Sequence, residues 1–121
     1  MKTIWTAQCI LANEVNLYQE DWEHIVDGHP EMAGREELVK LAIQKPIYIQ
    51  EAGNPVTAAY VLSPDQNNPE GVRVIVGFSS EMWTFGNQVG DVKTGFPIDT
   101  KAYPHPNLGQ IIWPKPKAGA K

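Results

Sequence analysis

The hydrophobic pattern of the chain changes from helical to extended at Lys45–Pro46, and this change limits the fold more than any other feature. Between Gly34 and Gln44, apolar residues recur at spacings of three and four, which predicts an amphipathic helix. Short β-prone segments follow, separated by turn residues: 46–51, 57–63, 72–78, 82–85 and 91–98. Helices followed by a run of antiparallel strands predict an α+β domain.

An acid-rich segment predicts an earlier helix at residues 20–27. Acidic side chains are favoured in the first turn of a helix. Gly28 suits the position that follows the last turn, because glycine adopts positive φ at little cost. Further upstream, the alternation in residues 3–8 fits either a short strand or the start of a helix.

Length and charge indicate one domain with a distinct tail. The 121 residues fit a single domain at 1–100, followed by a Pro/Lys-rich tail at 101–121. The net charge of −4 combines a body of −8 with a tail of +4. An acidic body disfavours nucleic-acid binding, which needs a local excess of cations. The tail is interpreted either as a solvated terminus or as the source of those cations.

The chain carries few signals for cofactors, membranes or export. Its single cysteine, Cys9, excludes an intramolecular disulfide and a multi-cysteine zinc site. No apolar run approaches the ~20 residues of a membrane span, and Gln8 interrupts the only stretch similar to a signal peptide. No glycine-rich phosphate loop occurs. We therefore predict a cytoplasmic protein without a cofactor or membrane partner.

Two histidines form the nearest approach to a metal site. His24 and His29 are five residues apart across the predicted helix end, and Glu23, Asp27 or Glu31 would complete a ligand set for a metal hydrolase. Acid-rich helix starts usually serve capping and solvation instead. We therefore predict no metal.

The segment DWEHIVDGHPE at residues 21–31 resembles the opening of the phage-associated nucleases of the barnase–EndoU–colicin–RelE-like (BECR) superfamily. These domains open with a W-x-H-I-x-x-x-H-P-E helix and continue with a second helix that closes on x-x-P-x-x-I. The matching residues are Trp22, His24, Ile25, His29, Pro30 and Glu31, followed by Pro46 and Ile49. Residues 92–97, VKTGFP, are similar to a family strand with a threonine ahead of an aromatic-Pro pair.

This resemblance implies a fold and an activity. The fold would place N-terminal helices on a four- to five-stranded antiparallel sheet, with the site on the open face of the sheet. The activity would be metal-independent RNA cleavage by a nuclease of toxin or phage-effector type. Such cleavage needs a base for the 2′-hydroxyl proton, an acid for the departing 5′-oxygen and a donor to the phosphate. Histidine suits the two proton transfers.

The resemblance also implies roles for individual residues. His29 would be the principal acid/base group, with His24 as its partner or orienting residue. Arg73 would donate to the phosphate, and Thr94 would hydrogen-bond a phosphate oxygen. Two further residues would contact the RNA: Lys93 and Ser79.

Each role has a structural alternative. His29 is equally suited to capping the helix C-terminus, where a cation is favoured. His24 fits a half-buried structural position on an amphipathic helix. Arg73 alternates with two valines, so its side chain would also fit a solvent-facing position.

The charge near the site favours a second hypothesis. Eight acids and one base, Arg35, lie between Glu14 and Glu37. Such a field repels RNA and suits a basic protein. The alternative function is therefore a catalytically inactive BECR-like module whose acidic helical face binds a cognate protein, as an inhibitor or assembly factor.

Overall fold

The computed structural model describes residues 2–9, 13–53, 56–62, 71–78, 89–98 and 111–113. Seven strands form one sheet: β1 (Thr3–Gln8), β2 (Glu14–Tyr18), β3 (Tyr48–Glu51), β4 (Thr57–Leu62), β5 (Gly71–Phe78), β6 (Val89–Ile98) and β7 (Ile111–Trp113). Three helical elements lie between β2 and β3: α1 (Gln19–Gly28), the 3₁₀ helix η1 (Pro30–Met32) and α2 (Glu36–Gln44). The predicted strand at 82–85 lies outside the described residues.

The sheet is mixed, with the order β1-β2-β6-β5-β4-β3-β7. Its centre is an antiparallel meander of β3 to β6, and β7 adds to its β3 edge. The β1–β2 hairpin joins at the other side through a parallel pairing of β2 with β6. The predicted four- to five-stranded antiparallel sheet, preceded only by helices, is therefore wrong: two strands come before the helices, and the sheet has seven strands with one parallel pair.

The β1–β2 hairpin contains a polar pair of which one residue is buried. This pair is the reason that the sequence pattern does not predict β2. Val15 and Leu17 are fully buried, but Asn16 between them is buried too, so the segment does not alternate between apolar and polar residues. Thr6 Oγ1 donates to Asn16 Oδ1 across the hairpin at 2.5 Å. This bond satisfies a buried amide that would otherwise be costly.

Both helices form where the sequence predicts them. Acidic residues occupy the first turn of each, and the buried positions of α2 recur at helical spacing as Val39, Ala42 and Ile43. The expected positive φ at Gly28 is wrong, because Gly28 is the last residue of α1 and the cap is His29, with φ −137°. Pro30 explains this cap, since the residue before a proline favours extended backbone.

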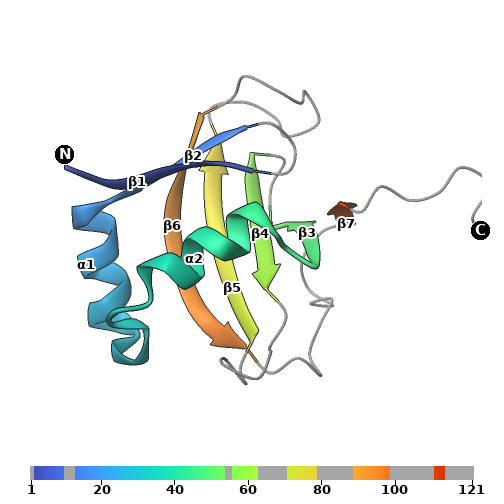
Figure 1. Cartoon of the computed structure of the whole chain (residues 1–121). Coiled ribbons are helices and arrows are strands. Elements are labelled where there is room, and N and C mark those ends of the chain that lie inside the picture. Colours follow the sequence, from blue (N-terminus) through green and yellow to red (C-terminus); the bar gives the residue numbers. More distant parts are fainter. Residues whose placement is uncertain are drawn as a thin grey trace, which may run out of the picture.

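The core lies between α2 and one face of the sheet. Val72, Val74 and Val76 of β5 are fully buried on this face, and a Cβ on Gly95 would meet Val39 of α2 at 3.8 Å. Figure 1 shows α2 crossing the sheet while α1 lies beside β6. β2 pairs only with residues 89–91 of β6. The remaining edge of β6 is therefore left to α1.

The opposite face of the sheet is buried at one side and accessible at the other. Ala59 and Val61 of β4 are fully buried there, so the predicted open face is not open over β4. On β6, by contrast, Lys93 is exposed and Phe96 is half-buried. Accessible chemistry on this face is therefore confined, within the described residues, to the β6 side.

Candidate functional site

His29 contacts β6 through an aromatic stack with Phe96. Its imidazole stacks on the ring of Phe96, with centroids 5.5 Å apart and planes at 29°. Its Nδ1 lies 3.5 Å from Oε1 of Glu31. The His29 side chain is 39% exposed, so a substrate can reach it. His29 is also the C-cap residue of α1, where its backbone N–H donates to Ile25 O at 2.7 Å, so its position fits the helix-capping alternative as well.

Arg73 is the neighbour of the same aromatic ring on the next strand. In the register of β5 and β6, Arg73 is paired with Phe96, and paired residues of antiparallel strands project to the same face. His29 contacts Phe96 through its side chain, whereas Arg73 is its register partner on the neighbouring strand. The structure therefore relates the two principal predicted site residues through Phe96.

The Arg73 guanidinium is buried instead of facing solvent. Arg73 is 5% exposed and donates from Nη2 to the hydroxyl of Tyr48 at 3.5 Å. Within the part of the chain that the structure describes, its Nε is buried without a hydrogen-bond partner and Arg73 forms no ion pair. Taking a guanidinium out of water without an anion is costly. The guanidinium extends over β4 toward β3, where the Tyr48 hydroxyl is its partner.

Thr94 and Lys93 project on the same face as Arg73. Thr94 is paired with Ile75, two residues along β5 from Arg73, and is half-buried. The register shifts between Ile75 and Val76, and the Lys93 side chain lies over Gly77, where an added Cβ would come within 2.9 Å of Lys93 Cε. Three of the six predicted residues thus share one side of the β5–β6 pair.

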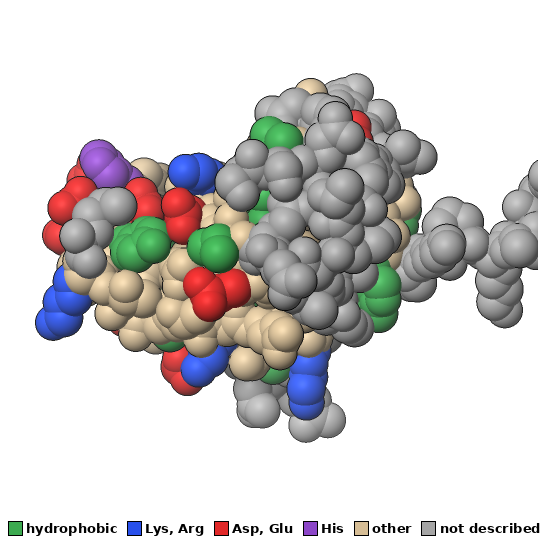
Figure 2. Space-filling view, turned by 90° about the horizontal axis from the view of Figure 1, so that it is seen from above, with side chains coloured by type: hydrophobic (Ala, Val, Ile, Leu, Met, Phe, Trp, Pro, Cys, Tyr) green, Lys and Arg blue, Asp and Glu red, His purple; other side chains and the backbone are tan. Residues whose placement is uncertain are grey.

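His24 lies apart from this group. At 100° per residue, it projects from the side of α1 opposite the buried Trp22 and Ile25. It is exposed and lines a shallow hollow of about 400 Å³ with Glu20, Glu23 and Asp27. In Figure 2, red carboxylates and a histidine gather at one end of the molecule. The half-buried position considered for His24 is therefore wrong. The sixth predicted residue, Ser79, lies outside the described residues.

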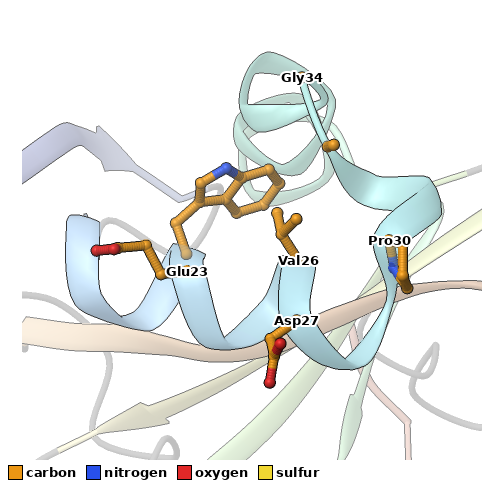
Figure 3. Close-up of a pocket in the computed structure, with 7 residues that line it drawn as sticks. Glu23, Val26, Asp27, Pro30 and Gly34 are labelled. Carbon is orange, nitrogen blue, oxygen red and sulfur yellow. The ribbon is translucent and has the colours of Figure 1, made fainter.

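A second hollow of about 500 Å³ lies between α1 and the start of α2. Its lining residues are Trp22, Glu23, Val26, Asp27, Pro30, Ala33 and Gly34. Figure 3 shows Val26 pointing into the hollow, while the carboxylates of Glu23 and Asp27 point away from it. The hollow therefore has an apolar floor and an acidic margin, which it shares with the hollow at His24.

Sequence reasoning gave no role in RNA cleavage to three residues that define the site. Phe96 and Glu31 belong to the two motifs that carry the resemblance, but only the folded chain shows that both touch His29. Tyr48 is buried, and its hydroxyl accepts from Arg73. No local pattern predicts this bond, since register across three strands brings the two residues together.

Metal and membrane sites find no support in the described part of the chain. No cluster there holds three or more His, Cys, Asp or Glu side chains placed for a metal ion. The described helices are also too short or too polar to span a bilayer.

Comparisons with known proteins leave the chain without an assigned family. No protein-family model, no curated protein and no solved structure matches it.

Proposed function

We propose that this protein is a metal-independent ribonuclease of toxin or phage-effector type that cleaves RNA at the β5–β6 surface beside His29. The observation that carries the proposal is the accessible imidazole of His29, which stacks on Phe96, the register partner of Arg73. Cleavage of RNA needs a group that transfers a proton and a cation that stabilises charge at the phosphate.

The chemistry assigns one task to each residue. His29 takes the proton of the 2′-hydroxyl, whose oxygen attacks the phosphorus. The bond from phosphorus to the 5′-oxygen breaks, and water supplies a proton to that oxygen. Arg73 provides positive charge for the phosphate, and Thr94 hydrogen-bonds one of its oxygens. The products are a 2′,3′-cyclic phosphate and a 5′-hydroxyl.

Charge distribution supports binding on this side. The acids of α1 project from its outward side, as Glu20, Glu23 and Asp27 do around His24, whereas Lys93 is exposed on the β5–β6 side. RNA approaching this side therefore meets the ammonium group of Lys93. The buried, free thiol of Cys9 suits a reducing compartment, so we place the activity in the cytoplasm.

An RNA cleavage assay tests the proposal. Purified protein is incubated with tRNA and total cellular RNA, with and without EDTA, and the 3′ ends are analysed. We expect cleavage that EDTA leaves unchanged and cyclic-phosphate ends. His29→Ala should lower the rate by about 10²-fold or more. His24→Ala is the matched control, since it removes the same group from the acidic side, and it should cleave like wild type.

Two results would contradict the proposal. Intact RNA with wild-type protein would exclude ribonuclease activity. Equal rates for wild type and His29→Ala would exclude the proposed site.

The second hollow favours one other function, binding of a basic protein segment without catalysis. Its apolar floor at Trp22 and Val26 suits an aliphatic side chain, and Glu23 and Asp27 at its margin suit flanking lysines. A partner that acts with this protein as inhibitor or assembly factor would place such a segment there. Charge complementarity is what selects a basic partner.

A peptide titration followed by NMR tests this alternative. The probe is acetyl-Lys-Lys-Leu-Leu-Lys-Lys-amide, and the control replaces both leucines with serines. Specific docking shifts the amides of Val26 and Ala33 with the leucine peptide only. Equal shifts with both peptides would show charge attraction alone and would contradict the alternative.

A further inference from the structure

We propose that Glu31 is a positioning residue that holds the His29 imidazole with Nδ1 toward its carboxylate and leaves Nε2 for proton transfer with the substrate. The inference rests on the proposed ribonuclease function and deepens it. It begins from the 3.5 Å approach of His29 Nδ1 to Glu31 Oε1.

Two contacts restrict the two side-chain rotations of His29. The stack on Phe96 limits the plane of the imidazole, and the Glu31 carboxylate, 3.5 Å from Nδ1, favours the ring orientation that keeps Nδ1 toward it. A single contact would leave the ring free to turn over, which would exchange the two nitrogens. Glu31 and Phe96 thus have complementary tasks.

The backbone around Glu31 is itself fixed. Glu31 is the middle residue of η1, where Met32 N–H donates to His29 O at 2.9 Å and Ala33 N–H donates to Pro30 O at 3.2 Å. Met32 is fully buried and anchors the turn in the core. The carboxylate of Glu31 therefore starts from a defined position although its side chain is 48% exposed.

This arrangement has a direct chemical consequence. When Nε2 takes the 2′-hydroxyl proton, the imidazole becomes a cation. A carboxylate that accepts from Nδ1–H stabilises that cation and keeps Nε2 as the nitrogen that receives the proton. Without Glu31, the other tautomer places a proton on Nε2 and blocks the transfer.

The test combines kinetics with a spectroscopic measurement on the full chain. Glu31→Met removes the acceptor, Glu31→Gln keeps a neutral acceptor, and Glu37→Met removes an equal charge from an exposed position of α2. We expect Glu31→Met to lower kcat by about 10- to 100-fold with little change in KM, a part of the 10²–10⁴ contributed by a placed acid/base group. Glu31→Gln should recover part of the loss, and Glu37→Met should match wild type.

Long-range ¹H–¹⁵N spectra of the histidine side chains provide a readout that is independent of activity. At about pH 8.5, where an ordinary imidazole is neutral, His29 should carry its proton on Nδ1 in wild type and shift toward Nε2 in Glu31→Met. His24 provides the internal reference. If His29 has the same tautomer in both proteins, or if Glu31→Met retains the wild-type kcat, the positioning role is excluded.

The two proposals fail in different ways. Wild-type protein that shows the Nδ1–H tautomer but leaves RNA intact retains the role of Glu31 in orienting His29 and excludes the ribonuclease. Wild-type protein that cleaves RNA through His29 with an unchanged rate in Glu31→Met retains the ribonuclease and excludes the positioning role.

Discussion

The imidazole of His29 stacks on the phenyl ring of Phe96 with a centroid separation of 5.5 Å. One residue follows the first helix, and the other lies near the end of the last long strand. The contact joins the N-terminal part of the chain to the β5–β6 surface, where Arg73 is paired with Phe96. The proposed chemistry depends on this long-range contact.

Replacement of the aromatic ring should impair catalysis more than stability. Aromatic pairs contribute about 0.5–1.5 kcal/mol beyond buried area, so Phe96→Leu is expected to lower kcat by up to roughly tenfold. Cleavage rate and thermal unfolding measure the two effects. Phe78→Leu is the matched control, because Phe78 is buried on the helix-covered face. If both variants lose rate only in proportion to folded protein, the stack has no catalytic role.

Arg73→Met should separate charge from packing. Replacing a buried charge by an apolar side chain of similar length is often neutral or stabilising by about 1–4 kcal/mol, so the midpoint of urea unfolding should stay or rise. Loss of a preorganised donor to the phosphate should lower kcat by about 10²–10³-fold. A stable Arg73→Met protein that cleaves RNA at the wild-type rate would remove Arg73 from the mechanism.

Two glycine substitutions should have opposite effects on stability. A Cβ at Gly90 would lie 2.6 Å from Phe78 Cε1 and 2.8 Å from Val76 Cγ1. Gly90→Ala should therefore cost about 1–3 kcal/mol by overpacking. Gly28 ends α1 with no heavy atom within 4 Å of an added Cβ, so Gly28→Ala should gain about 0.5–1 kcal/mol. Equal unfolding midpoints would contradict the packing at Gly90.

Stability should decrease in alkaline solution because of Tyr60. Burial, with a contribution from Cys9, raises the pKa of Tyr60 well above its ordinary value of 10.0. The folded protein then keeps a proton that the unfolded chain releases above pH of about 10. The free energy of unfolding should fall there by about 1.4 kcal/mol per pH unit. Urea unfolding of wild type and Tyr60→Phe above pH of about 10 tests this. The variant should lack the part of the fall in unfolding free energy with pH that Tyr60 causes.

Local pattern was sufficient for the helices and the central strands. α2 and β5 carry periodicities that match their environments, with the inward positions of α2 apolar and β5 rich in valine. β2 was missed because Asn16 is buried through a bond to Thr6, and pattern rules assign asparagine to loops. The parallel pairing of β2 with β6 joins segments far apart in sequence, and no local signal specifies it.

The sequence predicts which residues belong to the candidate site better than it predicts how they are arranged. The resemblance drew attention to His29, Arg73 and Thr94. Arg73 and Thr94 share one face of the β5–β6 pair, and His29 stacks on Phe96 of β6. Helical geometry also separates His24 from them, since it projects opposite Trp22 and Ile25. The burial of Arg73 and its bond to Tyr48 arise from register across β3, β4 and β5, which depends on the whole sheet.

The parallel pairing of β2 with β6 also sets an order of events during synthesis. Residues 14–16 can form the backbone hydrogen bonds of their outer edge only after residues 89–91 have been synthesised. At about 5–20 residues per second, the ribosome leaves that edge unpaired for several seconds, during which it can join other chains. Phe96 emerges later still, so His29 cannot adopt its stacked position until most of the sheet has been made.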